Sequence, residues 1–228
     1  MKRLIFWFLN VIIRLGTSIL CRIERAPLKQ VPKHGPLILA VNHIGSLEVP
    51  LLFAWLQPRQ LTGLAKIETW DSKFMGWLFD LWEAIPVRRG EADLEAIRRS
   101  LAVLEAGEIL AVAPEGTRSG NGQLQHAQAG IAFLALRSCV PILPMAHWGG
   151  ESFSANFKQR KRTDFHVRVG KQFTLDPGGE KVTAEVRQAM ADEVMYQIAA
   201  LMPGPYRGEY ADLSRATTKY LRFDNEII

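Results

Sequence analysis

The chain has 228 residues, enough to bury a hydrophobic core within one α/β-sized domain. Hydrophobic residues make up 48% of it and charged residues 22%, a composition that excludes disordered, collagen-like and low-complexity proteins. With only Cys21 and Cys139, neither a disulfide framework nor a four-cysteine zinc site is possible.

The net charge of +5 is concentrated at the N-terminus. Residues 1–33 contain seven lysines or arginines and the single acid Glu24, whereas the rest of the chain carries a net charge of −1. A basic segment confined to a hydrophobic N-terminus favours a membrane surface with anionic lipids over nucleic acid, which requires a basic stripe across the folded domain. We therefore expect a membrane partner and no nucleic acid.

Residues 1–28 are predicted to form an amphipathic helix that associates with a membrane. The longest uncharged apolar run, Leu4–Ile13, is well short of the roughly 20 residues that span a bilayer, and no signal-peptide cleavage site follows it. On a helix the polar side chains form one narrow stripe: Arg3, Asn10, Arg14, Ser18, Arg22 and Arg25. Trp7 and Phe8 suit the headgroup boundary, so we expect a monotopic protein on the cytoplasmic face of a membrane. The alternative is a helix packed on the domain with this stripe outward.

Beyond this segment, short apolar runs alternate with helical patterns. In chain order the predicted elements are strand Leu37–Val41, helix Glu48–Leu56, strand Leu61–Ala65, helix Trp70–Trp82, strand Ala84–Val87, helix Glu91–Ala106, strand Ile109–Ala113, helix Ala129–Arg137, strand Val140–Ala146, strand Phe165–Val169 and helix Val182–Leu201. The alternation predicts an α/β fold with a mostly parallel central sheet flanked by helices, in a domain of residues 29–202. Residues 203–228 are predicted to form a C-terminal tail.

Polar residues follow three of the predicted strands. His43 comes after the first strand, Arg89 after the third, and Glu115 and Arg118 after the fourth. Because ligands of open α/β sheets bind outside the carboxyl ends of the strands, we expect these side chains to line one crevice.

His43 and Glu48 are a candidate catalytic pair. On one continuous helix they would point about 140° apart, but in a strand-to-helix loop capped by Ser46 the carboxylate can fold back onto the imidazole. A carboxylate on one ring nitrogen sets the tautomer of a base whose other nitrogen faces the substrate. The alternative is a surface histidine beside an acid in the first turn of a helix.

Two turns carry groups that bind phosphate. The segment 114–120, Pro-Glu-Gly-Thr-Arg-Ser-Gly, combines backbone N–H groups with a guanidinium, and Arg88 and Arg89 add cations at another strand end. Taken alone, the first is equally an ordinary exposed turn and the second a solvated basic pair.

Four motifs occur in order along the chain, and with them the sequence resembles a lysophospholipid acyltransferase of the 1-acylglycerol-3-phosphate acyltransferase type. The family's Asn-His motif and its acid match Asn42, His43 and Glu48, with Glu in place of the usual Asp. Its Ile-Pro-Val-x-Arg motif matches residues 85–89, and Lys66 resembles the family's phosphate-binding lysine.

The other two motifs lie further along. Pro-Glu-Gly-Thr-Arg-Ser is intact at residues 114–119, after Ala113 in place of the usual Phe, and Val-Pro-Ile-Leu-Pro at residues 140–144 resembles the fourth motif. Gln128 stands where the family usually has a lysine. The resemblance covers nearly the whole domain, and four motifs in order are far more specific than any one of them.

The resemblance implies transfer of a fatty acyl group from acyl-CoA or acyl-ACP to the free hydroxyl of a lysophospholipid, such as 1-acylglycerol-3-phosphate to give phosphatidic acid. His43 is the implied general base, because an alcohol is a poor nucleophile at neutral pH, and Glu48 orients the imidazole. No acyl-enzyme is required.

The resemblance also assigns roles to the polar groups around this pair. The implied ligands of the acceptor phosphate are Lys66, Arg89 and Arg118, and the implied site-shaping loop contains Glu115, Gly116 and Thr117. We expect no bound cofactor and no metal, and His34, His126, His147 and His166 are assigned to neither.

Other functions stay open. The acceptor is alternatively another lysolipid or a glycolipid, and a noncatalytic peripheral lipid-binding protein would need the basic N-terminus but not His43 and Glu48. A phosphohydrolase ranks lower because the chain has neither a phosphate-cradling Gly-x-x-x-x-Gly-Lys loop nor a His-Glu-x-x-His pair. The apolar segment Phe74–Trp82 is expected to contact acyl chain or membrane, or else to pack in the core. The basic run Lys158–Arg162 is expected to be a solvated or lipid-facing loop.

Overall fold

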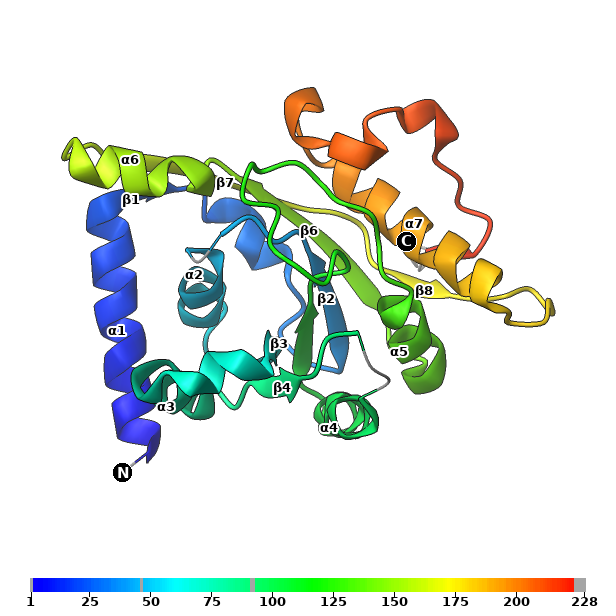
Figure 1. Ribbon diagram of the computed structural model, residues 1–228, viewed down its shortest axis with the longest axis horizontal. Helices are drawn as coiled ribbons and strands as arrows, with labels where there is room; N and C mark the ends of the chain where they lie inside the picture. The colour runs from blue at the N-terminus through cyan, green and yellow to red at the C-terminus, as the bar shows by residue number, and fades with distance from the viewer. Residues whose placement is uncertain (1, 46, 91–92, 224–228) are drawn as a thin grey trace.

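Helices cover both faces of a central sheet in the computed structural model, which describes residues 2–45, 47–90 and 93–223 (Figure 1). The strands of this described part are β1 (Cys21–Ile23), β2 (Leu37–Val41), β3 (Leu61–Lys66), β4 (Ile85–Val87), β5 (Ile109–Val112), β6 (Ile142–Trp148), β7 (Thr163–Val169), β8 (Phe173–Leu175) and β9 (Leu221–Phe223). The helices are α1 (Lys2–Leu20), α2 (Glu48–Trp55), α3 (Lys73–Leu81), α4 (Leu94–Glu105), α5 (Gly130–Ser138), α6 (Phe153–Lys158) and α7 (Ala184–Ala200). The predicted α/β class is confirmed.

The sheet is mostly parallel, as predicted. Its strand order is β1-β7-β6-β2-β5-β3-β4, and of these pairings only β6 with β7 is antiparallel. A short antiparallel extension joins β8 to β6 and β9 to β8. β2 lies between β5 and β6, so the residues that follow it lie near the middle of the carboxyl edge.

Each predicted strand occurs within two residues of its expected ends, whereas the helix starts differ more. α4 was expected from Glu91, which lies outside the described residues; its cap is Asp93, whose carboxylate accepts the N–H of Ala96 at 3.0 Å. α3 was expected from Trp70 but begins after Ser72, which is extended and accepts the N–H of Met75. Side-chain caps therefore set both starts.

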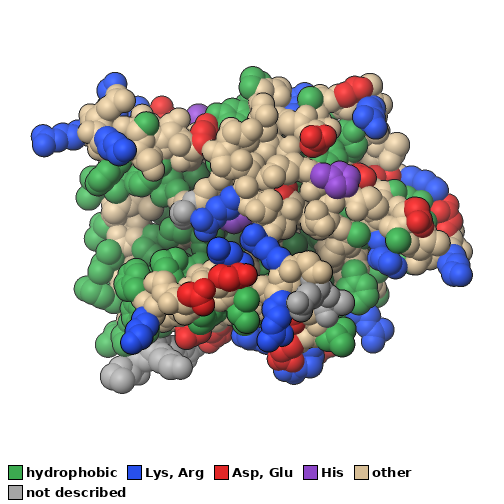
Figure 2. Space-filling model, viewed as in Figure 1, with side chains coloured by type: hydrophobic (Ala, Val, Ile, Leu, Met, Phe, Trp, Pro, Cys, Tyr) green, Lys and Arg blue, Asp and Glu red, His purple; other side chains and the backbone are tan. Residues whose placement is uncertain are grey.

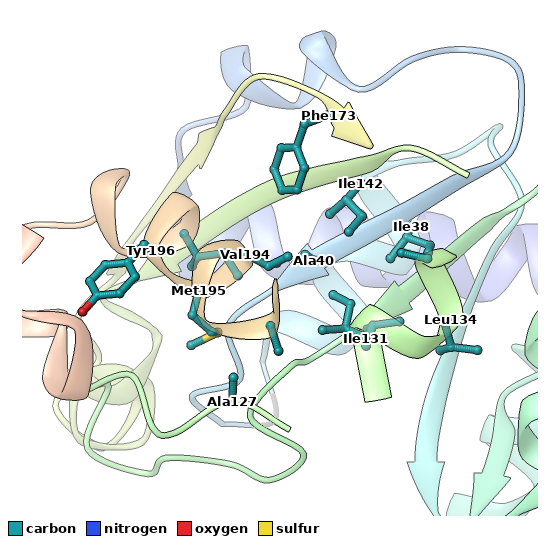
Figure 3. Close-up of a cluster of buried hydrophobic side chains, with 14 of the residues drawn as sticks. Ile38, Ala40, Ala127, Ile131, Leu134, Ile142, Phe173, Val194, Met195 and Tyr196 are labelled. Carbon is teal, nitrogen blue, oxygen red and sulfur yellow. The ribbon is translucent and has the colours of Figure 1, made fainter. Parts of the chain in front are cut away.

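The alternating side chains of β2 divide the core between the two faces of the sheet. Ile38 and Ala40 point into a cluster with α4, α5 and α7, part of which is drawn in Figure 3. Leu37 and Leu39 point into a second cluster, which α2 and α3 cover. Because all four side chains are fully buried, β2 is held firmly on both faces.

The polar side of α1 faces the protein. Arg14 Nε donates to the carbonyl of Ala54 at 2.8 Å, and Trp55 Nε1 donates to Thr17 Oγ1 at 3.1 Å. Asn10, in the same stripe, is buried. The predicted alternative, a helix with this stripe outward, is therefore wrong.

The opposite side of α1 is apolar and open to solvent. Its exposed side chains, 40–70% accessible, are Leu4, Ile5, Trp7, Phe8, Ile12, Leu15 and Ile19. We call these seven residues the α1 outer face. Within the part of the chain that the structure describes, no helix has the length and apolar character needed to cross a bilayer.

The predicted polar stripe is too long. α1 ends at Leu20 because the next three residues form β1, so Arg22 and Arg25 are not on the helix, and the side chain of Arg3 lies outside those described. Arg162, from the basic run expected to be a loop, donates to the carbonyls of Ser18 and Cys21 at the end of α1. Arg162 thus bonds carbonyl groups at the end of α1 while its side chain stays exposed.

The C-terminal residues up to 223 are docked on α7. Buried Glu193 accepts hydrogen bonds from Thr217 Oγ1 at 2.5 Å, from the N–H of Lys219 at 2.8 Å and from the N–H of Tyr220 at 2.9 Å. These bonds lead the chain into β9, which extends the sheet.

Candidate active site

A cavity of about 300 Å³ lies at the carboxyl edge of the parallel strands. Most of the predicted site residues line it: His43, Glu48, Lys66, Arg89, Thr117 and Arg118. Glu115, also predicted to line this crevice, does not. Figure 2 shows Lys and Arg side chains gathered around a hollow in the middle of this face, with hydrophobic side chains along the left edge, where Figure 1 places α1. The fold thus joins groups from four separate segments in one crevice.

His43 and Glu48 are in direct contact. Nδ1 of His43 lies 2.5 Å from Oε1 of Glu48, and the two side chains are 18% and 5% exposed. His43 precedes the helix, because α2 begins only at Glu48, so the two side chains are not held on opposite sides of one helix. Ser46, expected to cap this helix, lies outside the described residues.

The carboxylate of Glu48 is ionised at neutral pH. Burial raises its pKa, but the hydrogen bond from His43 and the interaction with the neighbouring imidazole rings outweigh burial and lower the pKa to about 2. The N–H of Gly45 donates to the same Oε1 at 3.0 Å, which fixes the carboxylate beside the ring. A carboxylate on Nδ1 leaves Nε2 of His43 to accept a proton from a substrate.

Asn42 and His147 join β2 to β6 next to this pair. The Asn42 side chain donates to the carbonyl of His147 and accepts its N–H, both at 2.9 Å, while Nε2 of His147 lies 2.8 Å from the carbonyl oxygen of Asn42. Burial lowers the pKa of His147, so the ring is neutral with its proton on Nε2. The sequence alone predicts no role for His147, since a partner 105 residues away leaves no local pattern.

Glu115 holds the loop that follows β5. Its carboxylate accepts the N–H of His43 at 2.8 Å and the N–H of Gln125 at 2.9 Å, and burial raises its pKa despite these bonds. Gly116 has φ of +70°, a left-handed conformation that favours glycine, and a Cβ there would come within 3.2 Å of Gln128. Glu115 and Gly116 therefore shape the loop from outside the cavity, whereas Thr117 lines it.

Three cations face the cavity without an acidic partner. Lys66 ends β3, Arg89 follows β4 and Arg118 lies on the loop after β5, and all three are exposed. Within the described residues none of them has a carboxylate within 4.0 Å. Arg118 Nε lies 3.4 Å from Nε2 of His43, on the side of the ring away from Glu48. The three cations are thus free to bind an anion beside the base.

The inner wall of the same cavity is apolar. Phe53 and Trp82 stack with their ring centroids 5.0 Å apart, and Phe79 packs against Trp82. Gly63 lies beneath Phe53, where an added Cβ would make ordinary contact at 3.7 Å. The predicted apolar segment divides accordingly, because Phe79 and Trp82 are buried along the cavity while Phe74 and Trp77 are exposed on the surface of α3.

Metal ligands do not cluster in the described residues, where no group of three or more His, Cys, Asp or Glu side chains is placed to hold an ion. The groups in the cavity are instead a base, an acid, three cations and an apolar wall. This set suits an anionic amphipathic molecule.

Comparison with known proteins agrees with these groups. A family model described as Acyltransferase matches residues 22–148. A 1-acyl-sn-glycerol-3-phosphate acyltransferase of Bacillus subtilis is 27% identical over 133 residues, which cover 58% of this chain and 66% of the relative. One from Pseudomonas aeruginosa is 25% identical over 186 residues, covering 79% of this chain and 71% of the relative. A lyso-ornithine lipid O-acyltransferase of the same species is 30% identical over 112 residues, which cover 49% of this chain and 42% of the relative.

A solved structure shares the fold. The 1-acyl-sn-glycerophosphate (LPA) acyltransferase PlsC of Thermotoga maritima has a TM-score of 0.61 to this chain and 18% sequence identity, covering 88% of this chain and 81% of the other. At this level of identity the likeness concerns architecture.

Proposed function

This chain belongs to the Acyltransferase family, and we propose that it moves a fatty acyl group from a thioester of coenzyme A or acyl carrier protein to the free hydroxyl of a lysophospholipid. The proposed acceptor is 1-acylglycerol-3-phosphate, and the product phosphatidic acid. The observation that carries the proposal is the His43–Glu48 pair, which lies in one cavity with three cations and an apolar wall.

The proposed chemistry uses His43 as a general base. The acceptor hydroxyl oxygen attacks the thioester carbon while its proton passes to Nε2 of His43, and Glu48 stabilises the resulting imidazolium. The tetrahedral intermediate then collapses, its C–S bond breaks, and the leaving thiolate takes the proton from His43. The products are a phospholipid ester and a free thiol, and the enzyme returns to its starting state.

Recognition of the acceptor is assigned to the three cations. Lys66, Arg89 and Arg118 come from separate strand ends, so together they can surround a phosphate that carries two negative charges. Holding the phosphate there positions the hydroxyl near Nε2 of His43, which lowers the entropic cost of the reaction. The apolar wall around Phe53 and Trp82 is assigned to a fatty acyl chain.

A second acceptor class has specific support. The residue beside Gly116 is Gln128, where the resembled family usually has a lysine, and one relative is named as a lyso-ornithine lipid acyltransferase. The second candidate is therefore acyl transfer to a lysolipid whose headgroup is not a phosphate monoester.

The deciding experiment measures thiol release from acyl-CoA and from acyl-ACP by the detergent-solubilised protein. Lysophosphatidic acid, lyso-ornithine lipid or no acceptor is added, with His43→Ala alongside. We expect acceptor-dependent release that the substitution abolishes while the circular dichroism spectrum stays unchanged. Equal release by His43→Ala would overturn the mechanism, and no release with any acceptor by the folded protein would favour a noncatalytic lipid-binding role.

Membrane association is proposed through the α1 outer face. An exposed apolar face, with basic residues near the helix end, suits insertion at the headgroup boundary of an anionic bilayer. Phe8→Asp changes this face without touching the contacts that hold α1 to the domain, and Leu94→Asp is the matched control, because Leu94 is an exposed apolar residue of α4. We expect flotation with anionic vesicles to fall for Phe8→Asp alone. Equal flotation of both variants would show that another surface binds the membrane.

A further inference from the structure

A second apolar groove of about 300 Å³ lies between α4, α5 and the sheet. Its walls come from Ile97 on α4, Ile131 and Leu134 on α5, and Val87 and Val112 on the strands between them. α4 and α5 contact each other below this groove, on the face of the sheet opposite to α2 and α3. The groove therefore belongs to neither the catalytic pair nor the apolar wall around Phe53.

The groove reaches the active site at its upper end. Leu64 and Ala113 line both cavities. Pro114 and Gln128 line the groove from the same loop that carries Thr117 and Arg118 into the catalytic cavity. A molecule at the carboxyl edge of β3 and β5 thus has an apolar channel on each face of the sheet.

Three polar side chains line the groove, those of Asp93, Ser100 and Gln128, and the first two have hydrogen-bond partners. Asp93 accepts the N–H groups of Arg88 and Ala96, each at 3.0 Å, and Ser100 Oγ donates to the carbonyl of Ala96 at 2.7 Å. The other residues that line the groove are apolar or glycine, so the groove suits an apolar occupant better than a polar one.

We infer that the groove between α4 and α5 binds the fatty acyl chain of one of the two lipid substrates, while the cavity beside Phe53 binds the other. The inference rests on the proposed function, since acyl transfer to a lysolipid brings two long chains to one reacting centre. Two chains that approach from opposite faces of the sheet avoid competing for a single channel. The shared chemistry is a fatty acyl chain, and its source is either the thioester or the lysolipid.

Gly130 offers a substitution that narrows the groove and is compatible with folding. It lines the groove at the first position of α5, and an added Cβ would meet no atom within 4 Å. Leu at this position favours the helix, so Gly130→Leu is expected to fold at least as stably as the wild type. Ala102→Leu adds similar apolar volume at an exposed position of α4 outside the groove and is the matched control.

The first arm varies chain length in the turnover assay, once in the thioester and once in the lysolipid, with soluble short-chain substrates. Burial of each methylene is worth up to about fourfold in kcat/KM. We expect Gly130→Leu to lose this gain for the longer members of one series and to keep it for the other, and the affected series identifies the source. Unchanged length dependence in both series, with activity retained, would overturn the inference.

The second arm does not depend on turnover. A fatty acid with a photoreactive tail is crosslinked to the His43→Ala protein, and the labelled peptides are mapped. We expect label on both 94–105 and 130–138, reduced by Gly130→Leu and unaffected by Ala102→Leu. Label confined to the catalytic cavity would refute the second chain site even if the protein were inactive as an acyltransferase, whereas label in the groove without turnover would reject only the proposed reaction.

Discussion

Replacing Glu48 by Gln tests the catalytic pair directly. Oε1 of Glu48 contacts both Nδ1 of His43 at 2.5 Å and the N–H of Gly45 at 3.0 Å. A glutamine oxygen in the Oε1 position still accepts both of these N–H groups, so the tautomer of His43 is kept. What is lost is the negative charge that stabilises the imidazolium when Nε2 takes the proton.

The magnitude follows from the charge that the hydrogen-bond acceptor loses. A hydrogen bond to a charged group contributes about 1.5–3 kcal/mol, so kcat should fall about 10- to 150-fold. The KM for the acceptor should change little, because the carboxylate is 5% exposed and contacts His43 and Gly45 rather than the cations. Steady-state thiol release at saturating thioester, with the acceptor concentration varied, separates the two constants.

Glu48→Asp is the control for this prediction. It keeps the negative charge and shortens the side chain by one methylene, so it should retain more activity than Glu48→Gln. A glutamine variant with wild-type kcat would refute the reasoning, because proton transfer to His43 would then not depend on the carboxylate. An aspartate variant as inactive as the glutamine variant would show that geometry, rather than charge, decides the rate.

Three further predictions follow from the geometry. The pKa of Glu48 is about 2 in the folded protein against 4.5 when free, so its ionisation stabilises the fold above pH 4.5. About 3 kcal/mol of this stability is lost as the pH falls toward 2. In urea titrations across this range, the free energy of unfolding should depend less on pH for Glu48→Gln than for the wild type, and an equal pH dependence would contradict the assignment. Arg89→Ala should raise the KM for a phosphate acceptor about tenfold with less effect on kcat. Added salt should raise the KM of this variant less than that of the wild type. An equal rise in the KM for a lysolipid without phosphate would argue against headgroup binding by Arg89. Glu193→Leu removes the hydrogen-bond acceptor of Thr217, Lys219 and Tyr220, so it should lower the free energy of unfolding by at least about 2 kcal/mol and make the C-terminal residues more sensitive to proteolysis. Wild-type resistance to proteolysis would show that β9 docks without these hydrogen bonds.

The sheet was predictable because its central strands carry strong local patterns. Leu37–Val41 is an uninterrupted apolar run that is buried on both faces, and it occurs with the predicted ends. β1, β8 and β9 have three residues each, too few for a period of two to stand out, and their pairings are long-range. α6, with six residues, was missed for the same reason.

The candidate site was predictable where one segment carried the chemistry. His43 and Glu48 meet as the loop hypothesis required, and Lys66, Arg89 and Arg118 reach the same cavity because they follow adjacent strands. Their roles stay predictions until the variants are measured. His147 was not predictable, since its function in the fold depends on Asn42 across the sheet.

The orientation of α1 needed the structure. A polar stripe on a helix can face water or a polar partner, and the sequence does not distinguish the two. Here the carbonyl of Ala54 accepts from Arg14 and the indole N–H of Trp55 donates to Thr17, so the polar side of α1 faces the protein. Both partners belong to α2, a segment that shows no sign of this contact in its own pattern.

The base and the anion-binding groups sit on parts of the fold that differ in rigidity. His43 follows the central strand, with Asn42 bonded to β6 on one side and Glu115 bonded to the His43 N–H on the other. Lys66, Arg89 and Arg118 are exposed and lie at the ends of strands or on a loop. Under the proposed function, the cations that bind the headgroup can therefore be substituted one at a time while the His43–Glu48 geometry is preserved. A change of acceptor would then require only substitutions at exposed positions around an unchanged catalytic pair.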